Sequence, residues 1–162
     1  MSPEAWTFST AEKIRFGLGV VDDAGVEARS LGPSLKRALI VTDKGVVNLG
    51  LVERVKSRLQ EAGFEVDAFD EVKPDPSTEE VQRCVEFGRA VGCDLMVGLG
   101  GGSPMDTAKA SACLVHLNMR VVDCIGVNRI PTPGIPLVAI PTTAGTGAEV
   151  TNSAVVVDRE RV

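Results

Sequence analysis

Three consecutive glycines, Gly100 to Gly102, stand between an apolar run and a sequence typical of a helix start. The run before them, DLMVGL at 94–99, has the length and character of a buried strand. Pro104 suits the first position of a helix because it has no N–H to leave unpaired. A strand that passes through glycines into a helix directs backbone N–H groups and the positive end of a helix dipole at one point. The junction therefore predicts an α/β fold with an anion site.

The rest of the chain alternates in the same way. Strand-like runs occur at 13–19, 37–42, 64–69, 94–99, 136–140 and 152–158. Helical patterns lie between them, at 22–31, 47–62, after Ser77 in a capping box with Glu80, and at 104–118. We therefore predict one α/β domain over residues 1–162, with a doubly wound, mostly parallel Rossmann-like sheet and helices on both of its faces.

The composition limits the kinds of molecule that this chain could bind and the compartment in which it is expected. The net charge of -5 argues against general binding to nucleic acid or a membrane surface, and no apolar run is long enough to span a bilayer. The N-terminal sequence does not resemble a secretory signal, so we expect a cytoplasmic protein. The four cysteines include no CxxC pair and are expected to be buried, reduced thiols. The single histidine, His116, is expected at the surface near a helix end and cannot supply a metal site alone.

The glycine loop has two interpretations from its residues. Glycines permit positive φ and leave no Cβ between the backbone and a phosphate, and Ser103 could donate to a phosphate oxygen. Alternatively, Ser103 and Asp106 form a capping box that needs no ligand. Three glycines exceed what a turn requires, which favours the phosphates of a nucleotide. The loop does not match the usual dinucleotide fingerprint, because it follows a middle strand and its third glycine is replaced by Ser103.

Two further strand ends carry polar groups. Asp43 follows the strand at 37–42 and could accept hydrogen bonds from a ribose, where its charge would oppose a 2′-phosphate; alternatively it caps a helix or a turn. Thr142, Thr143 and Thr146 follow the strand at 136–140 and could bind ribose, amide or phosphate groups, or bond to their own backbone. We assign no catalytic role to Glu149, because no partner base or metal cluster is visible.

The segments GGGSPMDTAK and PTTAGTGAEVT, together with LIVTDKG and KPDPS, resemble the iron-containing (group III) alcohol dehydrogenase family over nearly the whole chain. The resemblance implies that Asp43 contacts the adenosine ribose and favours NAD over NADP. It implies a pyrophosphate site at the glycine loop and a place near the nicotinamide for Asp106, whereas Lys109 is expected to serve packing or charge balance. The implied cofactor contacts are Asp43, Asp75, Gly100, Gly101, Gly102, Ser103, Asp106, Thr142, Thr143 and Thr146, with Asp75 near the adenine.

The resemblance also implies what this chain lacks. The family's iron or other divalent metal is held by one aspartate and three histidines from a second, helical domain, and none has a counterpart here. We therefore expect the NAD-binding half of an enzyme that transfers hydride between an alcohol and NAD, inactive by itself, with the C-terminal helical metal-binding domain absent. Its expected partners are the nucleotide and either a second copy or the missing domain.

Two other classes stay open from the sequence. The chain could be a free-standing nucleotide-binding module or subunit without catalysis. It could also be a cyclase domain of the dehydroquinate-synthase kind, although the threonine-rich loop and Ser103 argue against that class.

Overall fold

The computed structural model describes residues 10–126 and 128–159 and contains a parallel four-stranded sheet. The strands are β1 (Arg37–Val41), β2 (Glu65–Phe69), β3 (Leu95–Gly100) and β4 (Leu137–Pro141), and their order in the sheet is β2-β1-β3-β4. Parallel neighbours need crossover connections, and helices supply them here. The predicted α/β class and doubly wound parallel sheet are confirmed.

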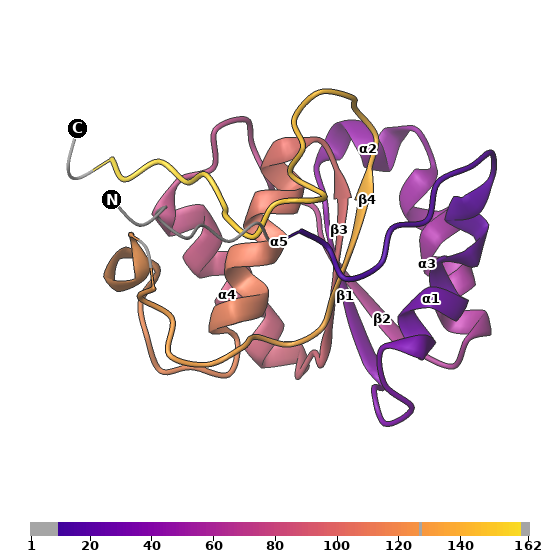
Figure 1. Cartoon of the computed structure of the whole chain (residues 1–162), viewed down its shortest axis with the longest axis horizontal. Helices are drawn as coiled ribbons and strands as arrows, with labels where there is room; N and C mark the ends of the chain where they lie inside the picture. The colour runs from indigo at the N-terminus through magenta and orange to yellow at the C-terminus, as the bar shows by residue number, and fades with distance from the viewer. Residues whose placement is uncertain (1–9, 127, 160–162) are drawn as a thin grey trace, which may run out of the picture.

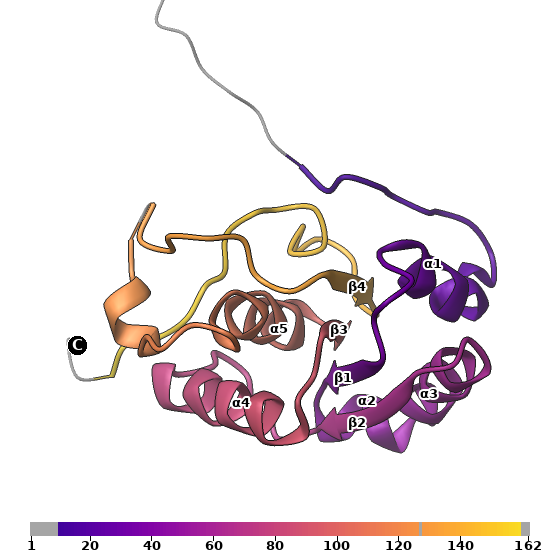
Figure 2. The same cartoon turned by 90° about the horizontal axis from the view of Figure 1, so that it is seen from below.

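Helices cover both faces of the sheet (Figures 1 and 2). One face carries α1 (Ala24–Ser30) and α3 (Leu51–Glu61), with the short 3₁₀ helix η1 (Val20–Asp23) leading into α1. The other face carries α4 (Thr78–Val91) and α5 (Gly102–Leu114), followed by η2 (Val121–Cys124). The five-residue helix α2 (Lys44–Asn48) follows β1 directly. No helix in the described ranges is long and apolar enough to cross a membrane.

Alternate residues of the central strands build two separate cores. Ile40 and Val97 face α1 and α3, whereas Leu39 and Met96 face α4 and α5, as the period of two in a strand requires. Every residue of β3 is buried, which explains its continuous apolar run. A Cβ at Gly98 would lie 3.0 Å from the Cβ of Ala108, so this glycine lets α5 pack closely on β3.

Three predicted helices have different bounds in the structure. The helix expected at 22–31 is the end of η1 followed by α1, which ends at Ser30. The helix expected at 47–62 is divided into α2 and α3, because Gly50 has a left-handed φ of 72° that interrupts the helical path. The helix expected at 104–118 begins earlier, at Gly102, with Gly101 as its N-cap, and ends earlier, at Leu114. The capping box of Ser77 and Glu80 at the start of α4 is confirmed.

The two strands expected at the ends of the chain do not form. Residues 13–19 run beside α1, where Lys13 pairs with Glu27 and Arg15 with Asp23 and Glu27, so the segment joins no sheet. Residues 152–158 make only an isolated bridge, because Val157 bonds to the backbone that precedes α4 instead of to β4. Self-association stays a prediction. An exposed apolar surface that bears on it lies near the start of the described chain, at Ile14, Phe16 and Leu18.

The cysteines are free thiols, as predicted, but only Cys84 and Cys93 are fully buried; Cys113 and Cys124 are partly exposed, since they lie at the outer side of α5 and in η2. Burial raises the pKa of Cys84 to about 12 and that of Cys93 to about 11, so both remain protonated at neutral pH. His116 is exposed in the turn that follows α5, as expected.

Candidate nucleotide site

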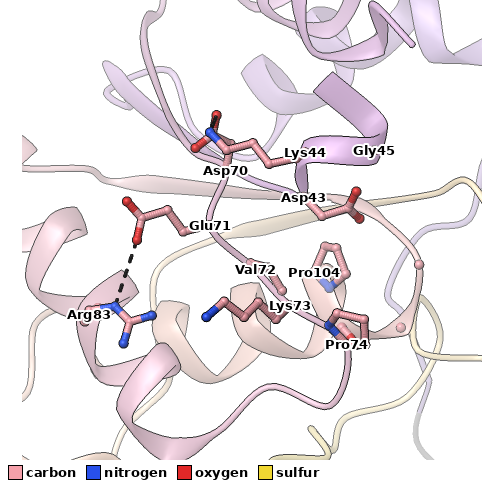
Figure 3. Close-up of a pocket in the computed structure, with 13 residues that line it drawn as sticks. Asp43, Lys44, Gly45, Asp70, Glu71, Val72, Lys73, Pro74, Arg83 and Pro104 are labelled. Carbon is pink, nitrogen blue, oxygen red and sulfur yellow. Dashed lines mark hydrogen bonds and ion pairs between the residues drawn. The ribbon is translucent and has the colours of Figure 1, made fainter. Parts of the chain in front are cut away.

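A pocket of about 730 Å³ lies at the carboxyl ends of β1, β2 and β3 (Figure 3). Its walls come from the start of α2, the segment after β2, one side chain of α4 and the start of α5. The lining residues are Asp43, Lys44, Gly45, Asp70, Glu71, Val72, Lys73, Pro74, Arg83, Gly101, Gly102, Ser103 and Pro104.

The strand order explains why a pocket opens at this place. From β1 the chain moves outward to β2, and it then crosses back over β1 to form β3 on the other side. The loops that follow β1 and β3 therefore leave in opposite directions and open a crevice between them. Asp43 follows β1 and Gly101 follows β3, so the two predicted binding segments form opposite sides of this crevice.

Glycine is required at one position of the glycine loop and not at the next two. Gly100 has a φ of 147°, and a Cβ there would lie 2.7 Å from Cγ of Pro104. At Gly101 and Gly102 φ lies outside the left-handed region, and an added Cβ would approach no atom closer than 3.4 Å. The fold itself therefore tolerates side chains at Gly101 and Gly102. Their absence leaves open backbone in the pocket, as a ligand that approaches the backbone closely would require.

The start of α5 has no side-chain cap. Gly101 is the N-cap residue, and among the described residues no side chain accepts a hydrogen bond from the first turn. The alternative capping box of Ser103 and Asp106 does not form, because both residues lie inside the helix. The first turn of a helix leaves N–H groups without partners and carries a partial positive charge. The geometry therefore leaves the donors of Gly102 and Ser103 available to an anion.

Asp43 caps a helix with one carboxylate oxygen and leaves the other at the pocket; its contact with a ribose stays a prediction. Its Oδ1 accepts a hydrogen bond of 3.0 Å from the N–H of Val46 and so caps α2. Its Oδ2 lies 3.5 Å from the position that a Cβ of Gly100 would take, beside the glycine loop. Within the described ranges, no hydrogen bond reaches this second oxygen, so it is available to a ligand hydroxyl.

The threonine loop after β4 lies against the glycine loop. The N–H of Thr142 donates to the carbonyl of Gly100 over 2.8 Å. Thr143 and Thr146 are the nearest neighbours that a Cβ at Gly101 and at Gly102 would meet. The Thr146 hydroxyl also accepts from the N–H of Ala148 over 3.4 Å, as the turn interpretation expected. The structure therefore brings the two loops together; their contacts with a cofactor stay a prediction.

Asp106 and Lys109 hold the segment that follows the threonine loop. Both side chains are 12% exposed and pair over 2.8 Å through Nζ and Oδ1. Asp106 Oδ2 accepts from the N–H of Val155 over 3.1 Å, and Lys109 Nζ donates to the carbonyls of Ala148 and Ser153. Both oxygens of Asp106 thus have protein partners, and a contact with nicotinamide would add to these bonds.

Four of the ten predicted residues line the pocket, and several lining residues were not predicted. The predicted residues outside its lining are Asp75, Gly100, Asp106, Thr142, Thr143 and Thr146. Asp75 is exposed, with a φ of 53°, and does not line the pocket, although its neighbour Pro74 does. The charged lining residues that were not predicted are Lys44, Asp70, Glu71, Lys73 and Arg83. The rule that ligands collect at strand ends identifies Asp70 and Glu71, which directly follow β2. No sequence signal identifies Arg83, because its place depends on how α4 packs.

Known proteins match this chain in sequence and in structure. A model of the family described as iron-containing alcohol dehydrogenase matches residues 11–162. The NAD-dependent methanol dehydrogenase of Bacillus methanolicus is 41% identical over 145 residues, which are 90% of this chain and 38% of that protein.

Two solved structures resemble the fold closely. A 1,3-propanediol oxidoreductase is 34% identical and has a TM-score of 0.91. The match covers 98% of this chain and 41% of the other chain. A sulfoacetaldehyde reductase from Bifidobacterium kashiwanohense in complex with NAD+ is 33% identical, with a TM-score of 0.86 over 98% of this chain and 41% of its own. The chain spans about two fifths of the length of these relatives.

Proposed function

This chain belongs to the iron-containing alcohol dehydrogenase family, and we propose that it forms the nucleotide-binding domain of an enzyme that transfers hydride between an alcohol and NAD. The observation that carries the proposal is the uncapped start of α5, which faces Asp43 across the pocket. Among the relatives, one solved structure was determined as a complex with NAD+, and one curated protein is described as NAD-dependent.

The residues of the pocket fit a dinucleotide. The N–H groups of Gly102 and Ser103 would donate to the pyrophosphate, with favourable energy from the helix dipole. Asp43 Oδ2 would accept from the hydroxyls of the adenosine ribose, and the threonines beside the glycine loop would contact the remaining phosphate or nicotinamide-side groups. Bound NAD supplies the carbon that accepts the hydride.

The metal in the family's name does not fit the described part of the chain. No three histidine, cysteine, aspartate or glutamate side chains lie together there in a group that could hold a metal ion. We therefore expect this chain to bind the cofactor without oxidising an alcohol by itself.

Titration calorimetry with NAD and NADP tests the proposal. We expect NAD to bind and NADP to bind more weakly, because the charge of Asp43 opposes a 2′-phosphate. The control variant Asp43→Gly should lose affinity for NAD and most of the preference between the nucleotides. Failure of the wild-type chain to bind either nucleotide would contradict the proposal, and equal binding of NAD by the variant would remove Asp43 from the site.

A nucleotide-binding subunit without any catalytic partner is a second candidate, favoured by the lack of a metal-binding group in the described residues. The two candidates share the same pocket and differ in turnover. Formation of NADH from short alcohols, measured with the 162-residue chain plus added Fe²⁺ or Zn²⁺ and then in the presence of a helical domain from a relative, separates them. Turnover that appears only with the added domain supports the dehydrogenase half.

A further inference from the structure

A lysine–aspartate ion pair stands on the rim of the pocket next to Asp43. Lys44 Nζ lies 2.6 Å from Asp70 Oδ2, and the two side chains are 70% and 33% exposed. Lys44 is the first residue of α2, and Asp70 directly follows β2. Figure 3 shows the lysine turned toward Asp70, while the side chain of Asp43 points the other way.

If the proposed function holds, this pair lies beside the place where NAD and NADP differ. The proposed function puts the adenosine ribose at Asp43, so a phosphate on its 2′-oxygen would meet Asp43 and the residues beside it. Sites that accept a 2′-phosphate supply a cation there. Lys44 is that cation by position, but Asp70 already neutralises it.

The other two cations of the pocket are less suited to this role. Arg83 comes from α4, with its nearest carboxylate, that of Glu71, at 4.0 Å, and in Figure 3 it lies at the end of the pocket away from Asp43. Lys73 belongs to the segment after β2, so it does not share a segment with Asp43. Lys44 alone among the cations that line the pocket shares a segment with Asp43.

We propose that Asp70 is a specificity-determining residue, which excludes NADP by holding Lys44 in an ion pair and by adding a negative charge to the rim. The inference rests on the proposed function, since it assumes that a nicotinamide dinucleotide binds in this pocket. Asp70 acts through Lys44 and needs no contact with the nucleotide. Its effect should therefore appear in the affinity for NADP and leave the affinity for NAD nearly unchanged.

Calorimetry on the full chain tests this with four proteins: wild type, Asp70→Asn, Glu71→Gln and the double variant Asp70→Asn/Lys44→Gln. Glu71→Gln is the matched control, because it removes the same charge from the same pocket without releasing Lys44. In Asp70→Asn we expect the ratio of the NADP to the NAD dissociation constant to fall about fivefold, the scale of one exposed ion pair. The control should change the ratio less than about twofold, and the double variant should restore it.

The outcomes separate this inference from the proposed function. If the wild type binds neither nucleotide, the proposed function fails and the inference fails with it. If the wild type binds NAD but Asp70→Asn leaves the ratio unchanged, or Glu71→Gln lowers it equally, the role of Asp70 is overturned and the proposed function stands. Far-ultraviolet circular dichroism checks the fold of each variant, and Asp70→Ser replaces Asp70→Asn should the latter misfold.

Discussion

The starts of α4 and α5 lie on the same face of the sheet and are built in opposite ways. At α4, Ser77 Oγ accepts from the N–H of Glu80 over 3.4 Å, and Glu80 Oε2 accepts from the N–H of Ser77 over 3.0 Å. Both side chains are buried. At α5, Gly101 takes the position of Ser77 and Pro104 that of Glu80, and the N-cap residue has no side chain that could cap the helix. The start of α4, which we call the closed start, stabilises the fold. The start of α5, the open start, leaves its N–H donors to a ligand.

The largest effect on stability is expected at Gly100, just before the open start, where the backbone conformation requires glycine. Gly100→Ala should lower the free energy of unfolding by about 4 kcal/mol, because it combines a strained φ with a collision against Pro104. Gly145→Ala is the matched control: its φ of 101° is equally unfavourable for alanine, but an added Cβ would meet no atom within 4 Å. Urea unfolding should show a loss of only about 1–2 kcal/mol for this control. Equal losses would remove the contact with Pro104 from the explanation.

The next largest effect is expected on binding, when the open start is closed. Gly101→Asp fits sterically and would place a carboxylate at the N-cap of α5, as Asp43 does for α2. We expect about a 100-fold weaker affinity for NAD, because the cap occupies the donors and repels the pyrophosphate. Gly101→Asn, which caps without charge, should lose less. Wild-type affinity in Gly101→Asp, measured by calorimetry, would show that the phosphates bind elsewhere.

A smaller effect is expected when the closed start is opened. Ser77→Ala removes the side-chain acceptor of the capping box and should reduce the free energy of unfolding by about 1 kcal/mol. The affinity for NAD should stay within about twofold of wild type, since α4 contributes only Arg83 to the pocket. Thermal denaturation and calorimetry on the same sample measure both quantities. A large loss of NAD affinity would argue that both helix starts serve the ligand.

The smallest expected difference between the two helix starts is in their stability at low pH. The Ser77 side chain and the backbone N–H at the helix start hold the pKa of Glu79 below its usual value of 4.5. Because the pKa is lower in the folded than in the unfolded chain, Glu79 stabilises the fold above about pH 4.5, and this contribution is lost as the pH falls through the folded value. Amide protection at Val81 should therefore decrease in acid. The first turn of α5 has no acidic residue and should lack this step, and so should Glu79→Gln.

Much of the fold could be predicted because its signals are local. The strand at 37–42 and the helix after Ser77 are specified by an apolar run and by a capping box within a few residues. The strand predicted at 152–158 failed because a strand requires a neighbour, and this segment bonds to Asp106 and to the backbone before α4. Nothing within residues 152–158 encodes that choice of partner.

In the candidate site, too, the residues with a local sequence signal were predicted and those that depend on strand order were not. The glycine loop and Asp43 were predicted because each directly follows an apolar strand. Their position across one crevice follows from the strand order, and the roles assigned to them stay predictions until a nucleotide is titrated. The strand-end rule could have identified Asp70, but its ion pair with Lys44 was missed because that pair joins two different strand ends. Charge pairs of this kind depend on which strands are neighbours.

The crevice between β1 and β3 also links ligand binding to the folding of the whole sheet. Its two sides are separated in sequence by β2 and α4, so they meet only after the chain has crossed back over β1. A dinucleotide that bound both sides would therefore require β1 and β3 to be assembled side by side. By mass action, NAD at one hundred times its dissociation constant would add about 2.7 kcal/mol to the free energy of unfolding. Occupancy by a nucleotide would thus raise the free energy of unfolding of the assembled domain.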